Sequence, residues 1–146
     1  MYERSGPYIG VMTFEKAAAP DVEELAELNR QLIEDERHPN PMDRHQLAER
    51  MAGWLREGYT CYLARESGTT VAYCLYRDDG DHYYLRQLFV ARTHRRRGIA
   101  RSLMDWMYAN IWTDRRVRLD VLAHNDEAAA FYRAYGFRVA VLRMEK

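Results

Sequence analysis

The chain has 146 residues, of which 47% are apolar and 30% charged, the size and composition of one ordinary globular domain with a substantial core. Its 22 Lys and Arg residues balance 22 Asp and Glu residues, and this zero net charge argues against a general electrostatic binder of nucleic acid. No apolar run approaches the roughly 20 residues of a membrane span, and MYERSGPYIG lacks the layout of a signal peptide, so we predict a single cytoplasmic domain over residues 1–146.

The first part of the chain predicts one strand and two helices. Residues 1–7 are expected to be loose, and residues 8–15 can form the strand. Asp21, three residues before Glu24, is typical of a capping box, and apolar residues follow it at helical spacing: Val22, Leu25, Leu28 and Leu32. A second helix begins near Asp43, with one apolar face formed by Leu47, Met51, Trp54 and Leu55. The two prolines of EDERHPNP predict a loop between these helices.

Two strand-like runs flank a two-residue turn at Ser67-Gly68. If these residues form the turn, positions that sum to 135 face each other, so Cys61 and Cys74 are expected to be cross-strand neighbours. In a reducing compartment we expect two small buried thiols rather than a disulfide. Neither cysteine has another Cys or a His at metal-ligand spacing, which argues against zinc.

The remaining elements follow from periodicity and turn residues. Strands are predicted at Tyr59–Ala64, Val71–Tyr76, Tyr83–Val90, Arg116–Ala123 and Phe137–Met144. A helix carries Ile99, Leu103, Met107 and Ile111 inward. A last helix is capped by Asn125 or Asp126 and ends at Gly136. The predicted order is β-α-α-β-β-β-α-β-α-β, a mixed sheet with helices on both faces.

The segment YYLRQLFVARTHRRRGIARSLMDWM places a strand, a basic turn and an amphipathic helix in succession. The first turn of a helix has N–H groups without intrahelical acceptors and a positive partial charge. A strand, turn and helix in this order therefore form a site at which backbone N–H groups can bind an anion. Gly98 allows close approach of the backbone, and the arginines before it add charge-assisted contacts to phosphate. The segment lacks the Lys-Ser/Thr of a Walker loop and the three spaced glycines of a dinucleotide site.

Two motifs occur in a defined order. Arg95-Arg96-Arg97-Gly98-Ile99-Ala100 follows a strand, and one helix and one strand later come Asn125, Ala128, Phe131, Tyr132, Gly136 and Phe137. They resemble the Gln/Arg-x-x-Gly-x-Gly/Ala and Asn-x-x-Ala-x-x-Phe-Tyr-x-x-x-Gly-Phe motifs of the GNAT superfamily of acetyl-CoA-dependent N-acetyltransferases. The resemblance covers nearly the whole chain. It implies an α/β (α+β) fold with a mixed, mostly antiparallel sheet of six to seven strands flanked by four helices.

The resemblance implies acetyl-CoA as co-substrate and no metal. The diphosphate of CoA would be held by the loop and helix start, at Arg95, Arg96, Arg97, Gly98, Ile99, Ala100, Arg101 and Ser102. The pantetheine arm would run along Leu88, Phe89 and Val90, and Asn125 would contact it. Alternatively, Asn125 is only a helix cap, and the arginine run is a solvated turn or an RNA contact.

The implied reaction is direct acetyl transfer to a primary amine. An amine with a pKa of about 10.4 must lose a proton before attack, and the departing thiolate needs one. Tyr132 is the predicted general acid, although it could be only a packed aromatic, and an N–H near Leu88 or Phe89 is the predicted oxyanion donor. Many relatives carry Glu where Gln87 stands; Gln cannot accept the proton, so Gln87 would position a water or the acceptor.

The acceptor is not readable from the sequence. Candidate relay or acceptor-binding residues are Glu34, Asp35, Glu36, His38 and His82. If the acids line the acceptor pocket they favour a cationic amine, and if not they are a solvated helix end. Two other functions stay open, a catalytically weakened acyl-CoA-binding module and an RNA-binding protein. A monomer and a homodimer are both compatible with the sequence.

Overall fold

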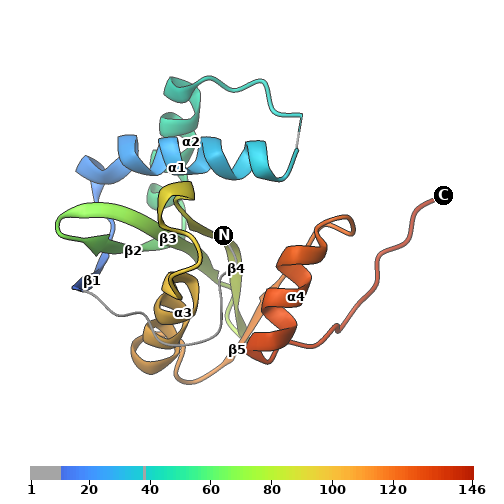
Figure 1. Cartoon of the computed structure of the whole chain (residues 1–146). Coiled ribbons are helices and arrows are strands. Elements are labelled where there is room, and N and C mark those ends of the chain that lie inside the picture. Colours follow the sequence, from blue (N-terminus) through green and yellow to red (C-terminus); the bar gives the residue numbers. More distant parts are fainter. Residues whose placement is uncertain (1–10, 38) are drawn as a thin grey trace.

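The computed structural model describes residues 11–37 and 39–146, and at its centre is a five-stranded mixed sheet in the order β1-β2-β3-β4-β5 (Figure 1). The strands are β1 Met12–Lys16, β2 Tyr59–Glu66, β3 Thr69–Asp78, β4 His82–Val90 and β5 Arg116–Leu119. Neighbouring strands from β1 to β4 are antiparallel, and β5 is parallel to β4. The predicted mixed α+β architecture is therefore confirmed.

Helices cover both faces of the sheet (Figure 1). They are α1 Val22–Asp35, α2 Arg44–Arg56, α3 Ile99–Asn110 and α4 Asp126–Tyr135, and short 3-10 turns lie at Ala19–Asp21 and Arg92–His94. On one face Trp54 of α2 packs on Tyr59 of β2, and on the other Trp106 of α3 packs on Tyr62. Because successive residues of a strand point to opposite faces, β2 contributes to both halves of the core.

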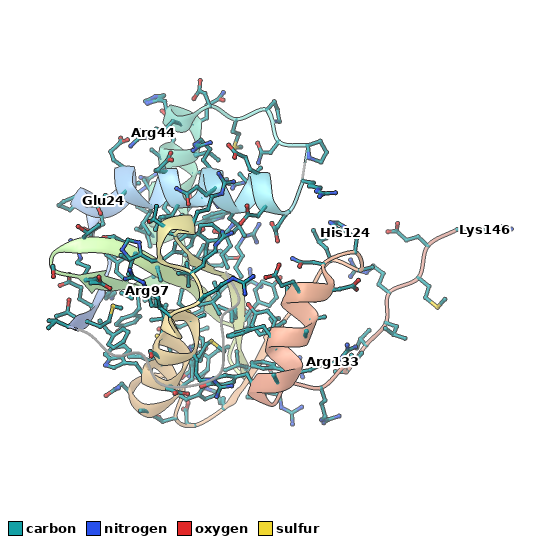
Figure 2. The ribbon with its side chains drawn as sticks, in the orientation of Figure 1. Glu24, Arg44, Arg97, His124, Arg133 and Lys146 are labelled. Atoms are coloured by element: carbon teal, nitrogen blue, oxygen red, sulfur yellow. The ribbon has the colours of Figure 1, made fainter. Side chains whose placement is uncertain are left out.

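The C-terminal segment corrects the predicted strand count. No strand forms at Phe137–Met144, and β5 ends at Leu119 rather than at Ala123, so the sheet has five strands among the described residues instead of six to seven. Val141 and Met144 are 82% and 87% exposed, and Figure 2 shows Lys146 at the far end of a segment that leads away from α4. Period-2 alternation indicates which residues would share a face, but a strand also needs a hydrogen-bonding neighbour, which this segment lacks.

The two cysteines are not cross-strand partners, contrary to the prediction. The β2–β3 register shifts between Ala64 and Arg65, so that Cys74 lies opposite Tyr62. Directly paired residues share a face and successive residues alternate, so Cys61 and Cys74 lie on opposite faces of the sheet. Both are buried and free.

The predicted start of α2 near Asp43 is confirmed, whereas the capping box predicted at Asp21 for α1 does not form. The Asp43 carboxylate accepts from the Gln46 N–H at 2.9 Å. The Asp21 carboxylate instead accepts from the Ala18 N–H at 2.7 Å, in the 3-10 turn that precedes α1, and pairs with Arg65. The Asp21 carboxylate is therefore bonded to Arg65 and to the 3-10 turn, and it is not the side-chain cap that the sequence predicted for α1.

Within the described residues, no helix has both the length and the apolar character needed to cross a bilayer. The cytoplasmic location stays a prediction of the sequence.

Candidate functional site

Among the described residues, no strand pairs with the second half of β4 on the side away from β3, and this side is called the open edge of β4 below. Strand β5 pairs with β4 only from His82 to Leu85, whereas β4 continues to Val90. The Ala91 N–H donates to the Val71 carbonyl at 2.8 Å, and backbone groups alternate in direction along an antiparallel strand. The main-chain groups of Leu88 and Val90 therefore point away from β3, toward the side that β5 has left. An extended ligand could bind this edge as a partial strand.

A bulge lies where this edge opens. Leu75 is opposite Gln87, but Tyr76 is opposite Leu85, so Arg86 is an extra residue in β4. Because of the bulge, Arg86 and Gln87 both contact residues on the α1–α2 face, namely Tyr59 and Tyr73.

The loop before α3 has the geometry of an anion site. Arg96 and Gly98 both have positive φ, 64° and 75°, which turns successive N–H groups to one side of the chain. Gly98 is the N-cap, and the first helical bond is donated by the Ser102 N–H to the Gly98 carbonyl at 3.0 Å. The N–H groups of Ile99 and Ala100 precede this bond, at positions where a helix supplies no acceptor. The prediction of an anion-directed loop is consistent with this geometry.

The arginines around the loop differ in their partners. Arg95 pairs with Asp35, its Nε donates to the Val90 carbonyl at 3.3 Å, and its guanidinium lies over the Phe89 ring. Arg97 lies 3.3 Å from Glu66. Arg96 is exposed and has no partner among the described residues. Arg96 is thus the arginine of the run whose charge is not paired with a described carboxylate.

Glu34 and Asp35 do not form a free acidic surface. Nη2 of Arg92 lies 2.8 Å from Glu34 and 3.1 Å from Asp35, and Glu34 also pairs with Arg30. These ion pairs fix the C-terminal end of α1 to the segment that follows β4. The same ion pairs neutralise the two carboxylates that would attract a cationic acceptor.

The other predicted acceptor residues are separated. The Glu36 carbonyl lies 3.3 Å from Nε2 of His124, at the N-terminal end of α4, so the loops after α1 and β5 meet (Figure 2). His82 lies at the opposite end of β4, between Asp79 and Asp81. His38 lies outside the described residues.

Gln87 belongs to a buried polar network. The donor-only guanidinium of Arg50 lies 2.8 Å from Oδ1 of Asn29, which fixes the amide orientation of Asn29. Nδ2 of Asn29 therefore donates to Oε1 of Gln87 at 3.2 Å and to the Tyr73 hydroxyl at 3.3 Å. The Tyr73 hydroxyl donates to the same Oε1 at 2.8 Å, and burial raises the pKa of Tyr73, so it stays protonated. Gln87 thus presents its Nε2 donors outward and cannot act as a base.

We expect Asn29→Ala to lower the free energy of unfolding by about 1–3 kcal/mol, because it removes the acceptor of Arg50 and a donor to Gln87 from a fully buried position. Urea denaturation measures this change. Asn110→Ala is the matched control, since its side chain makes one exposed bond to Trp106. Equal stability of the two variants would show that the network contributes nothing.

Asn125 and Tyr132 lie on the same helix. Oδ1 of Asn125 accepts from the Ala128 N–H at 3.1 Å, so Asn125 caps α4, and its Nδ2 donates to no described residue. Tyr132 is 8% exposed and belongs to the same buried cluster as Leu88 and Ala100. Capping therefore uses Oδ1 of Asn125 and leaves its Nδ2 without a described acceptor, and Tyr132 is largely buried.

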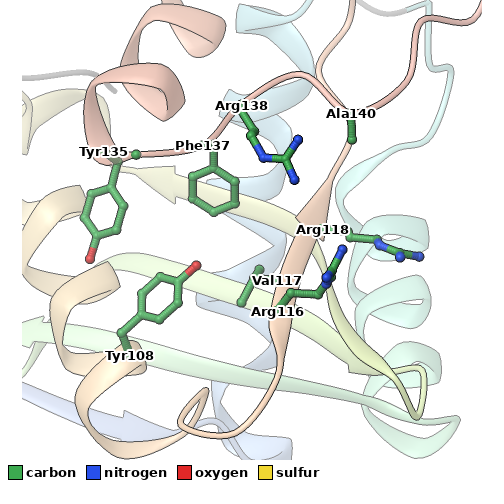
Figure 3. Close-up of a pocket in the computed structure, with 9 residues that line it drawn as sticks. Tyr108, Arg116, Val117, Arg118, Tyr135, Phe137, Arg138 and Ala140 are labelled. Atoms are coloured by element: carbon green, nitrogen blue, oxygen red, sulfur yellow. The ribbon is translucent and has the colours of Figure 1, made fainter.

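A cavity of about 490 Å³ lies elsewhere, between β5 and residues 136–140 (Figure 3). Its wall includes Tyr108, ten residues along α3 from Gly98 and thus about 15 Å along the helix axis. The open edge of β4 and the loop are therefore a separate site. No cluster of three metal-ligating side chains occurs among residues 11–37 and 39–146.

Sequence reasoning missed Asn29, Arg50, Tyr73 and Arg86. Asn29 alone had a local signal, since it is a polar residue adjacent to Leu28 on the buried side of α1. The bulge that lets Arg86 and Gln87 contact the same face of the sheet has no sequence signature.

Comparisons with known proteins agree with this geometry. The model of the acetyltransferase (GNAT) family matches residues 22–137. No curated protein matches. A possible acetyltransferase from Clostridium difficile 630 is similar in structure, with a TM-score of 0.79 and 19% identity over 92% of this chain and 95% of that one.

Two further similar structures contain the coenzyme. Aminoglycoside N-acetyltransferase AAC(6')-Iy in complex with CoA has a TM-score of 0.73 and 17% identity, over 97% of this chain and 99% of that one. A predicted acetyltransferase with acetyl-CoA from Clostridium acetobutylicum has a TM-score of 0.72 and 18% identity, over 93% and 96%. At these low identities, the TM-scores show a shared fold alone.

Proposed function

The chain belongs to the acetyltransferase (GNAT) family of acetyl-CoA-dependent N-acetyltransferases, and we propose that it transfers acetyl from acetyl-CoA to a primary amine of a small molecule or peptide by direct attack. The observation that carries this proposal is the open edge of β4 leading to a loop of positive-φ residues at the start of α3. Residues 1–146 would act as one domain.

The loop and the open edge suit the two parts of CoA. The N–H groups from Arg96 to Ser102 and the exposed guanidinium of Arg96 would hold the diphosphate. The main-chain groups of Leu88 and Val90 would pair with the pantetheine amides, and Nδ2 of Asn125 would donate to the same arm. Similar proteins are described with CoA and with acetyl-CoA, which supports this assignment.

Acetyl-CoA supplies the acetyl group as an activated thioester. The Leu88 N–H, which points into the open edge, would donate to the acetyl oxygen as negative charge develops there, and it is preferred over the Phe89 N–H, which points to β3. Tyr132 would donate its proton to the departing sulfur and recover one from solvent. The outward Nε2 of Gln87 would position the acceptor. The proton of the acceptor amine would leave through solvent, because no carboxylate or histidine forms a hydrogen bond with the described residues of the Gln87 network.

A panel of amines tests the proposal. We expect CoA release and acetylated amine to increase together with enzyme concentration, measured by a thiol reagent and mass spectrometry. The absence of a base at Gln87 favours one alternative, a module that binds acyl-CoA without turnover. Tight acetyl-CoA binding with no release across the panel would support that alternative.

The ion pairs of Arg92, Arg95 and Arg97 give little support to RNA binding through this segment. Steep salt dependence of RNA affinity, without competition by CoA, would favour it.

A further inference from the structure

Two arginines lie together on the α1–α2 face without a carboxylate partner among the described residues. The guanidinium carbons of Arg50 and Arg86 lie 4.5 Å and 4.7 Å from the centre of the Trp54 ring. Arg50 donates to Asn29, and Arg86 donates to the Tyr59 hydroxyl at 3.1 Å, so both bond to neutral groups. By contrast, Arg77 on the same face pairs with Asp79.

Arg50 is held in an unfavourable environment. Burial, followed by the nearby positive charge of Arg86, lowers the pKa of Arg50. Its Nε is buried and has no hydrogen-bond partner among the described atoms. A buried donor without a partner costs free energy, and an anionic ligand beside the two guanidiniums would offset their mutual repulsion and the burial of the Arg50 charge.

The two arginines adjoin the proposed site of acetyl transfer. Arg86 is the bulge residue next to Gln87, and Leu88 follows at the open edge. Arg50 is connected to Gln87 through Asn29 alone. An acceptor with its amine near Gln87 would therefore place its other end beside the guanidiniums.

We propose that Arg50 and Arg86 select an acceptor amine that also carries an anionic group, a carboxylate or a phosphate. This inference rests on the proposed acetyl transfer and names the acceptor class for the same site. This charge is opposite to that of the cationic acceptor, which the sequence left open as one alternative, and arginines already pair with Glu34 and Asp35. Planar guanidiniums bind both anionic groups well.

The experiment compares ω-amino acids, their amides and the matching aminoalkylphosphonates as acceptors for the wild-type protein and the variants R50Q and R86Q. We expect kcat/KM of the wild-type protein for at least one anionic series to exceed that for the amides by about tenfold or more. Each variant should raise KM for the anionic acceptor on the order of tenfold, and R86Q should leave the KM values for acetyl-CoA and the amide unchanged. The better anionic series distinguishes carboxylate from phosphate.

The variant R77Q is the matched control, because it removes a guanidinium from the same face that already has a carboxylate partner. It should keep the preference for anionic acceptors. Arg86 is exposed, so R86Q keeps the test decisive if thermal melting shows that R50Q does not fold.

Three outcomes separate the two proposals. Acetyl transfer with equal or better use of neutral and cationic amines would overturn the acceptor class and leave the transferase function intact. A preference for anions that persists in R50Q and R86Q would overturn the role of the arginines. No transfer to any amine and no acetyl-CoA binding by calorimetry would overturn the proposed function, and the acceptor class with it.

Discussion

Gly98→Val is expected to weaken CoA binding on the order of a hundredfold or more, measured by isothermal titration calorimetry. Gly98 has a φ of 75°, where a β-branched residue is strained by about 1–2 kcal/mol. The added side chain would also lie at the start of α3, between the ligand and the N–H groups of Ile99 and Ala100. Loss of two charge-assisted bonds to a diphosphate accounts for the magnitude.

Gly80→Val is the control that distinguishes backbone strain from the loss of contacts with CoA. Gly80 has a φ of 90°, nothing lies within 4 Å of the added Cβ, and the turn is at the other end of β4. This variant should lose comparable stability and keep its CoA affinity. If Gly98→Val titrates CoA like the wild-type protein, or if Gly80→Val loses CoA equally, the loop is not the binding site.

Tyr132→Phe is expected to lower kcat on the order of a hundredfold at neutral pH while acetyl-CoA affinity barely changes. The substitution removes the proposed proton donor and keeps the ring, which packs edge-on against Phe131 and Phe137. Steady-state kinetics and calorimetry measure the two quantities separately.

Tyr135→Phe is the control on the same helix. The Tyr135 hydroxyl donates to Asp105 at 2.6 Å, so its removal affects the packing of α4 on α3 and should leave turnover close to that of the wild-type protein. Unchanged turnover in Tyr132→Phe would mean that Tyr132 only packs.

The elements that could be predicted are those with a local signal. Apolar periodicity located the four helices, and the Ser67-Gly68 turn located the hairpin. The strand at Phe137–Met144 was wrong because alternation does not supply a neighbouring strand. The opposition of Cys61 and Cys74 was wrong because one irregularity near Ala64 shifts every later pair by a residue.

The candidate site divides in the same way. The loop from Arg95 to Ala100 is continuous in sequence, so its position before a helix could be read directly. The bonds that orient Gln87 join Asn29, Arg50 and Tyr73 across three elements, and only the tertiary fold brings them together. Arg95 pairs with Asp35 across sixty residues of sequence, so this ion pair could not be predicted from the local sequence either.

The placement of the two cysteines has a practical consequence. Burial raises the pKa of both thiols, and their side chains lie on opposite faces of the sheet, so we expect that neither reacts as a thiolate and that the two do not pair in the folded protein. Colour formed with an aromatic disulfide dye would then come from CoA alone, without background from the enzyme. The assay can accordingly be run without a reductant, which would itself consume that dye.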